Sequence, residues 1–255
     1  MKIATWNVNS IRAREERFLQ WLEKAKPDVV CVQELKVVDE AFPHDSLRKA
    51  GYHAAVHGQK TYNGVAILSR LEPTDVKRGF GDDDLQARLI AATVGEVRIL
   101  SAYFPNGETV GSEKYDYKLD WMRRLGAYLA QWHLPTEPIL LCGDFNVAPD
   151  DLDVARPRQW AGSVLCHDDA REALQRIRQW GFEDVLRNHH PEGHVYSWWD
   201  YRMLGFERNN GLRLDHIFAT SSMASRCISA DVDREERKGK KPSDHAPIVA
   251  VFEDV

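Results

Sequence analysis

Several polar side chains come directly after apolar runs of the kind that form buried strands. They are, in chain order, Asn7, Asn9, Glu34, Asp144 and Asn146. The carboxyl ends of strands are where open sheets build their sites. We therefore expect these side chains to converge at one sheet edge.

Two further segments place ionisable groups beside core residues. Asp215 lies within Leu-Asp-His-Ile-Phe, and Asp244-His245 precedes Ala-Pro-Ile-Val-Ala-Val-Phe. A carboxylate among apolar strand residues is costly to bury without a partner, so Asp215 needs one. Taken singly, each group has a structural explanation: Glu34 as a solvated strand end, Gly-Asp-Phe-Asn (143–146) as a turn, Asp244-His245 as a capping pair. Together they point to chemistry.

This set of side chains suits a divalent cation and a phosphoester. Oxygen ligands without a paired His or Cys set favour Mg²⁺ or Mn²⁺ over Zn²⁺. Such an ion neutralises a phosphate, a second carboxylate activates water, and an imidazole supports the developing charge. The residues alone therefore favour phosphoester hydrolysis.

The elements that must position these groups follow from hydrophobic periodicity. Strands are expected at residues 3–8, 28–34, 64–69, 89–94, 97–103, 139–142, 213–220, 228–233 and 246–252. Helices are expected at residues 12–24, 113–132 and 170–180, the last entered by Asp169-x-x-Glu172 as a variant capping box. Many strands with few long helices predict an α/β protein with more than one sheet.

Length and composition bound the class of protein. A chain of 255 residues with 43% hydrophobic residues can form one large domain, and no repeat or linker divides residues 1–255. Four scattered cysteines suit a reducing compartment, and no apolar run approaches the length of a membrane span, so we expect a soluble, cytoplasmic protein. The net charge of −5 has the wrong sign for binding nucleic acid by bulk charge alone. A polyanionic substrate therefore requires a local basic surface or a metal ion.

Two features are less specific. Trp198 and Trp199 could stack on bases, although core packing is the stronger expectation for at least one of them. The mixed charge run at residues 234–241 is by default a solvated loop, but its position just before Asp244 favours phosphate contacts by Lys238, Lys240 and Lys241.

Five ordered motifs resemble those of the exonuclease III branch of the endonuclease/exonuclease/phosphatase superfamily. They are Thr-Trp-Asn-Val-Asn (5–9), Gln-Glu (33–34), Gly-Asp-Phe-Asn (143–146), Asn-Gly-Leu-Arg-Leu-Asp (210–215) and Ser-Asp-His-Ala-Pro (243–247). Tyr-Phe-Pro-Asn-Gly (103–107) resembles the tyrosine motif of this branch and separates it from the phosphoinositide phosphatase and sphingomyelinase branches. The resemblance covers residues 7–245.

This resemblance implies a four-layer α/β sandwich: two mixed β-sheets face to face, helices outside, and a site at one edge. It implies Glu34 as principal ligand of Mg²⁺ or Mn²⁺, with Asn7, Asn9 and Asp244 near the metal. Asp144 would activate water, and His245, oriented by Asp215, would stabilise the transition state. Tyr103 and Asn146 would contact phosphate oxygens. The substrate-binding residues expected are Asn210, Arg213, Trp198, Lys238, Lys240 and Lys241.

The resemblance further implies action on duplex DNA with nicks, gaps or blocked 3′ ends, by a monomer. His167 stands where family members active on abasic sites usually carry a small residue, so we expect 3′-to-5′ exonuclease and 3′-end cleaning with weak or absent abasic-site incision. The alternatives are that His167 points into solvent and full abasic-site endonuclease activity remains, that the chain is a phosphatase or phosphodiesterase for small or lipid phosphoesters, or that it is a non-catalytic nucleic-acid-binding module.

Overall fold

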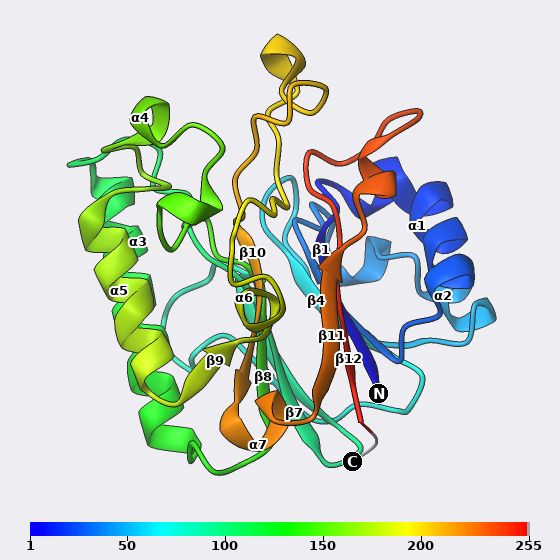
Figure 1. Ribbon diagram of the computed structural model, residues 1–255. Helices are drawn as coiled ribbons and strands as arrows, with labels where there is room; N and C mark the ends of the chain where they lie inside the picture. Colours follow the sequence, from blue (N-terminus) through cyan, green and yellow to red (C-terminus); the bar gives the residue numbers. More distant parts are fainter. Residues whose placement is uncertain (254–255) are drawn as a thin grey trace.

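Two six-stranded sheets lie face to face, with helices against their outer faces, in the computed structural model, which describes residues 1–253 (Figure 1). The first sheet has the order β11-β12-β1-β2-β4-β3, with bounds β1 (Lys2–Asn7), β2 (Val29–Gln33), β3 (His53–His57), β4 (Val65–Ser69), β11 (Cys227–Val232) and β12 (Ile248–Phe252). The second has the order β5-β6-β7-β8-β10-β9, with bounds β5 (Thr74–Arg78), β6 (Leu89–Val94), β7 (Val97–Tyr103), β8 (Ile139–Asp144), β9 (Phe182–Asp184) and β10 (Asp215–Thr220).

Both sheets are mixed. Strands β1 and β2 pair in parallel, as do β7 and β8, whereas the remaining neighbours pair antiparallel. The α-helices are α1 (Ile11–Ala25), α2 (His44–Lys49), α3 (Glu113–Trp132), α4 (Pro157–Trp160), α5 (Asp168–Gln179), α6 (Val185–His189) and α7 (Ser221–Ala224). Short 3₁₀ turns are η1 (Asp39–Ala41), η2 (Asp151–Asp153), η3 (Arg202–Leu204) and η4 (Arg234–Arg237). The predicted four-layer α/β sandwich is confirmed.

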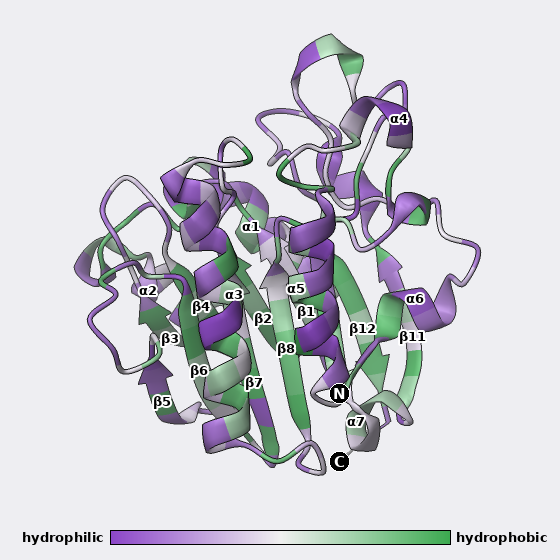
Figure 2. Ribbon diagram, turned by 90° about the vertical axis from the view of Figure 1, so that its left-hand side faces the viewer, coloured by the Kyte–Doolittle hydropathy of each residue, from purple (hydrophilic) through white to green (hydrophobic). Residues whose placement is uncertain are grey.

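Alternation along the central strands directs side chains into a core between the sheets and into one core beneath the helices on each outer face. In β8, Leu140 and Cys142 enter the core between the sheets, while Ile139 and Leu141 pack beneath the helices of the second sheet. Because both faces of such a strand are covered, its side chains are apolar on both faces and do not alternate with polar ones. Figure 2 shows this as largely hydrophobic strands behind the more polar outer helices α3 and α5.

The long helices begin at side-chain caps. The hydroxyl of Ser112 accepts a hydrogen bond from the Tyr115 N–H at the start of α3, and Ser10 does the same for α1. On α1, Phe18, Trp21 and Leu22 are buried against the first sheet. No helix within residues 1–253 is both long and apolar enough to cross a membrane.

The structure corrects two local predictions. Strands β3, β5 and β9 were not predicted, and each is the last strand at one end of its sheet. Edge strands are short or polar, so their periodicity is weak; β5 has mostly exposed side chains. The cap of α5 is His167, whose Nδ1 accepts a bond of 3.3 Å from the Asp169 N–H, so the predicted Asp169 capping box is wrong.

Candidate active site

Four of the predicted site residues point into the space between the sheets because of strand alternation. Asp144 is in phase with Leu140 and Cys142 on β8, and both of those lie in the inter-sheet core. Asn7 on β1, Tyr103 on β7 and Asp215 on β10 are in phase with inter-sheet core residues in the same way. The register also pairs Asp144 with Asp215 and with Tyr103 across neighbouring strands. These four residues thus lie at one edge of the sandwich.

Glu34 joins them through a break in the alternation. The β2 residues Val29 and Cys31 face the other sheet, whereas Val30 and Val32 face α1, so Glu34 would follow Val32 outward in a continuing strand. Instead Glu34 has a left-handed backbone (φ 54°), just after β2 ends. Its carboxylate is thereby placed at the inter-sheet edge.

Asn7 is the centre of a carboxylate cluster. Its Nδ2 donates to Glu34 Oε1 and to Asp144 Oδ2, both at 2.8 Å, and its Oδ1 accepts from the Asn9 N–H at 2.9 Å. The Tyr103 hydroxyl donates to Glu34 Oε1 at 3.0 Å. In this orientation Asn7 presents its amide nitrogen to the carboxylates, so it holds them in place and offers no ligand oxygen to an ion beside them.

His245 lies between two carboxylates. Its Nδ1 is 2.8 Å from Asp215 Oδ2, and its Nε2 is 3.6 Å from Asp144 Oδ2. The Ser197 hydroxyl donates to Asp215 Oδ2 at 2.6 Å, and Trp6 Nε1 donates to the His245 carbonyl at 3.1 Å. Asp215 is fully buried, and His245 is the partner that its burial requires.

The pKa values of His245 and Asp144 are both raised above their usual values, for different reasons. Burial lowers the pKa of His245, but Asp215 and then Asp144 outweigh it and raise the pKa to about 10. Burial, and to a lesser degree Asp215, raises the pKa of Asp144 to about 7, against the opposing effect of His245. His245 is therefore a cation at neutral pH, while Asp144 can exchange a proton there.

A second polar group borders the first. Lys36 Nζ is 2.8 Å from Glu34 Oε2 and 2.6 Å from Asn9 Oδ1, and Asn9 Nδ2 donates to Asp244 Oδ1 at 3.0 Å. Trp198 Nε1 donates to Asp244 Oδ2, also at 3.0 Å. Lys36 was not predicted as a site residue from the sequence. Its position two residues after Glu34 could have indicated that it lies near the site.

Asn146 closes the site on the side of the second sheet. Its N–H donates to Asp144 Oδ1 at 2.9 Å, and its Nδ2 donates to the Phe104 carbonyl at 3.0 Å. Asn106 Nδ2 donates to Asn146 Oδ1 at 3.2 Å. Asn146 itself has a left-handed backbone (φ 49°), a conformation that Asn tolerates better than most residues.

The residues present fit a divalent cation. Carboxylate oxygens of Glu34 and Asp144 lie within 4.8 Å of each other and of a ring nitrogen of His245, which as a cation would face the phosphate and not the metal. Carboxylate oxygens are the ligands that Mg²⁺ and Mn²⁺ prefer. A carboxylate cluster of this kind, without Cys, suits such an ion.

Arg213 does not face a substrate, contrary to expectation. It is 2% exposed, and its guanidinium donates to Asp153 Oδ1 at 2.6 Å and to Asp184 Oδ2 at 2.7 Å. Arg213 holds the pKa of buried Asp184 far below its usual range, against the effect of burial. This arginine is part of a buried ion network behind β10, which a single motif in the sequence cannot reveal.

The remaining predicted residues differ in exposure. Trp198 is half-buried with its ring edge-on to Trp160, whereas Trp199 is fully buried, as expected for one of the pair. The Asn210 side chain carries a buried Oδ1 with no hydrogen-bond partner among residues 1–253. Lysines 238, 240 and 241 are exposed in the loop after η4.

His167 does not project freely into solvent. Its side chain is 28% exposed, its Nδ1 caps α5, and its ring lies edge-on to Tyr115 with the ring centroids 5.6 Å apart. The imidazole is thus held in one place by the helix cap and the neighbouring ring.

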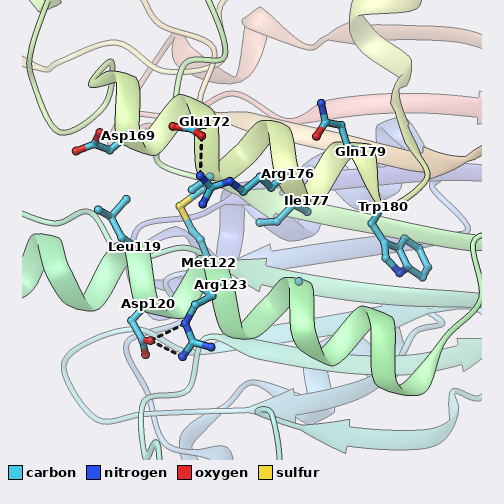
Figure 3. A pocket seen from close by; sticks show the side chains of 12 residues that line it. Leu119, Asp120, Met122, Arg123, Asp169, Glu172, Arg176, Ile177, Gln179 and Trp180 are labelled. Atoms are coloured by element: carbon cyan, nitrogen blue, oxygen red, sulfur yellow. Dashed lines mark hydrogen bonds and ion pairs between the residues drawn. The ribbon is translucent and has the colours of Figure 1, made fainter.

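A groove of about 800 Å³ lies elsewhere, between the outer helices α3 and α5 (Figure 3). Four of its charged side chains form two pairs, Arg123 with Asp120 on α3 and Arg176 with Glu172 on α5, as the dashed lines in Figure 3 indicate. None of the carboxylates of the cluster lines it. The ionisable groups suited to chemistry therefore gather at the sheet edge and not in this groove.

Comparisons with known proteins agree with this geometry. The profile of the endonuclease/exonuclease/phosphatase family matches residues 4–245. Exodeoxyribonuclease III of Haemophilus influenzae is 39% identical over 99% of this chain and 100% of its own length. An AP endonuclease structure from Archaeoglobus fulgidus superposes with a TM-score of 0.97 at 44% identity, covering 100% of both chains. The structure of the Neisseria 3′ phosphatase NExo bound to a product DNA hairpin gives 0.96 at 42%, covering 99% of both.

These matches extend over nearly the whole chain, and they include the elements that carry the carboxylate cluster. The order of the motifs along the sequence already indicated the same family. The chain belongs to the exonuclease III branch of the endonuclease/exonuclease/phosphatase family.

Proposed function

We propose that this protein is a divalent-metal-dependent DNA phosphodiesterase of DNA repair. It acts as a 3′-to-5′ exonuclease and removes blocked 3′ ends from duplex DNA, with weak or absent incision at abasic sites. The catalytic unit is one domain over residues 1–255, the last two of which lie outside the described residues. A monomer and a cytoplasmic location complete the proposal, the latter because the four cysteines are free thiols.

One observation carries the proposal above the others. A cationic His245 is held by buried Asp215 and lies 3.6 Å from a carboxylate, Asp144, whose pKa is near neutrality. Structural ion pairs do not need a carboxylate poised to exchange protons at the working pH, whereas a general base does. Glu34 completes the group with a ligand atom within 4.8 Å of the others.

Each residue then has a role that its contacts support. Asp144 accepts the proton of the attacking water, and the Asn146 N–H keeps its carboxylate oriented. His245 donates from Nε2 to an oxygen of the phosphate, while Asp215 accepts from Nδ1 and stabilises the imidazolium. As the P–O bond to the leaving group breaks, the positive charge of His245 offsets the negative charge that builds on the phosphorus oxygens.

Glu34 is the proposed principal metal ligand, with Asp244 and Asn9 near it; Asn7 joins them only if its amide turns. A bound Mg²⁺, or Mn²⁺, would neutralise phosphate charge and stabilise the leaving oxygen. Tyr103 and Asn146 are proposed to contact phosphate oxygens. Burial, followed by the charge of Glu34, raises the pKa of Tyr103 well above its usual value, so its hydroxyl keeps its proton for donation.

DNA contacts outside the reacting phosphate are assigned to three exposed lysines and to two partly buried side chains. Lysines 238, 240 and 241 are proposed to meet the backbone of duplex DNA, and Trp198 and Asn210 to meet the nucleotide near the cleaved bond. The unpartnered Oδ1 of Asn210 supports this, since a buried acceptor without a partner is costly unless a ligand supplies a donor.

A full abasic-site endonuclease is the second candidate. It is favoured by the 44% identity to an AP endonuclease over the full chain. The choice depends on His167, whose imidazole is held by its cap and by Tyr115. A fixed ring in that loop would restrict a flipped-out abasic nucleotide more than a terminal nucleotide.

A three-substrate comparison tests the proposal. One preparation is assayed with Mg²⁺ on a nicked duplex, on a 3′-phosphate end and on an internal abasic site, with Asp144→Asn as the inactive control. We expect turnover of the first two and little of the third, and His167→Gly should raise the third selectively. Equal abasic-site cleavage by the unmodified protein, or none gained by His167→Gly, would contradict the steric role of His167.

The alternative substrate classes are tested in the same way. Turnover of p-nitrophenyl phosphate or inositol phosphates in preference to DNA would indicate an enzyme for small phosphoesters. Absence of any metal-dependent turnover would indicate a binding module. Chelation of the metal should abolish cleavage and leave the fold intact, which circular dichroism can verify.

A further inference from the structure

A lysine outside every predicted motif joins the three loops around the site. Lys118 lies on the inner face of α3, between the buried residues Tyr115 and Trp121, and is 0% exposed. Its ammonium donates to the carbonyls of Asn106 at 3.1 Å, Asn146 at 2.8 Å and Val164 at 2.6 Å.

Each carbonyl belongs to a different functional loop. Asn106 is in the loop after β7, which follows Tyr103, and Asn146 is in the loop after β8, which follows Asp144. Val164 is in the segment that leads to His167 and α5. Asn146 and Val164 are 28 and 46 positions away from Lys118 in the sequence. Their carbonyls and that of Asn106 thus accept hydrogen bonds from the same ammonium group.

The donor count matches the acceptor count. A lysine ammonium has three N–H donors and no acceptor, and three carbonyls receive them here. Within residues 1–253, no other side chain donates to the carbonyl of Asn146 or of Val164.

The bond to Asn146 bears directly on the carboxylate proposed as general base. Asn146 adopts a left-handed backbone, and in that turn its N–H points to Asp144 Oδ1 at 2.9 Å. Removing the donor from the Asn146 carbonyl would leave a buried acceptor unsatisfied, which the loop can relieve by a shift of Asn146 toward another donor. Because the carbonyl and the N–H of Asn146 are joined through the same Cα, such a shift would also move the N–H that orients Asp144.

We propose that Lys118 is a positioning residue for the hydrolytic reaction, which sets the orientation of Asp144 by holding the Asn146 carbonyl. It also fixes the loops of Asn106 and Val164 to the same point. The inference deepens the proposed function and rests on it. Lys118 does not touch the reacting atoms, so its removal should affect the chemical step far more than DNA binding.

The test uses two substitutions and a matched control in the full chain. Lys118→Met keeps the length of the side chain and removes all three donors, whereas Lys118→Gln retains an amide with two. Lys2→Met is the control, because Lys2 also donates to a backbone carbonyl, that of Ala25 at 2.8 Å, but at the opposite end of β1 from Asn7. All are assayed on a 3′-phosphate duplex with Mg²⁺, after thermal melts have verified folding at the assay temperature.

The expected result is a split between kcat and KM. A displacement of about 1 Å at a catalytic group costs on the order of 100-fold in rate, so Lys118→Met should lose about that factor in kcat with little change in KM. Lys118→Gln should fall between Lys118→Met and the unmodified protein, and Lys2→Met should keep the kcat of the unmodified protein. Single-turnover rates with excess enzyme exclude a mere loss of folded molecules, because that rate constant does not depend on the inactive fraction.

Three results would overturn the inference: unchanged kcat in folded Lys118→Met, a change confined to KM, or failure of both Lys118 variants to fold, which would assign the residue to folding alone. Each leaves the proposed function standing as long as the unmodified protein cleaves DNA. Lack of DNA turnover by the unmodified protein would instead overturn the proposed function.

Discussion

The protonation of His245 gives the sharpest test of the site, and Asp215→Asn is the substitution that probes it. Asp215 Oδ2 lies 2.8 Å from His245 Nδ1 and is the largest influence that raises the pKa of this histidine, to about 10. Asparagine keeps the size of the side chain and removes its negative charge. The pKa of His245 should then return toward the ordinary value for histidine, about 6.5.

The size of the effect depends on pH in a defined way. With a pKa of about 10, His245 is almost wholly protonated at pH 8. With a pKa of about 6.5, only roughly 3% would be protonated at pH 8 but about three quarters at pH 6. If the imidazolium is the reactive form, the deficit in kcat should therefore grow by roughly 25-fold between pH 6 and pH 8.

Stability should show the corresponding sign. Because the folded pKa of His245 lies above its ordinary value, the His245–Asp215 pair stabilises the folded state fully below about pH 6.5. That contribution is lost as the pH rises toward about 10. The difference in unfolding free energy between the unmodified protein and Asp215→Asn should accordingly be largest in acid and should shrink with rising pH.

Two assays read these outcomes. Steady-state kcat on a 3′-phosphate duplex from pH 6 to pH 9 gives the profile, and an NMR titration of the His245 ring in metal-free protein gives its protonation directly. The Ser197→Ala variant is a useful comparison, since it removes a neutral neighbour of Asp215 and keeps the charge. A deficit that is constant with pH, or a ring that titrates near neutrality in the unmodified protein, would refute the reasoning.

Three other predictions concern catalysis, DNA binding and stability. Asp144→Asn should reduce kcat by several orders of magnitude with DNA binding largely retained, as measured by turnover and fluorescence anisotropy; a loss of binding alone would contradict its role as base. Lys240→Ala combined with Lys241→Ala should weaken DNA binding and flatten its dependence on salt concentration, and a purely kinetic effect at saturating DNA would contradict the proposed contact. Arg213→Met should lower the unfolding free energy by about 3–5 kcal/mol in urea denaturation, because buried Asp184 loses its arginine and buried Asp153 keeps only Arg187; an unchanged midpoint would contradict the ion network.

Local sequence patterns determined the central strands and the long helices. The bounds of α3 agree with the prediction at both ends, because an amphipathic repeat and a serine cap are signals within a few residues of each other. The edge strands β3, β5 and β9 were not predicted, because their pairing partners, and not their own composition, make them strands.

The candidate site divides in the same way. Alternation on β8 and β10 already placed Asp144 and Asp215 in phase with apolar residues, so their convergence was predictable. The motif at residues 210–215 predicts a substrate contact for Arg213, because it contains neither of the carboxylates that pair with this arginine. In the structure Asp153 and Asp184, from distant segments, lie against its guanidinium. Burial of a charge depends on partners that only the tertiary fold supplies.

The sequence by itself determined which chemical groups follow the central strands, because a strand of period two commits each side chain to one face. Only the tertiary structure decided that Glu34 turns back into the inter-sheet edge, that His167 caps a helix, and that Lys118 joins three loops. The physical reason is that side-chain alternation depends only on residues close together in the sequence. A hydrogen bond or ion pair instead forms between whichever groups the packed sheets bring within about 3 Å of each other.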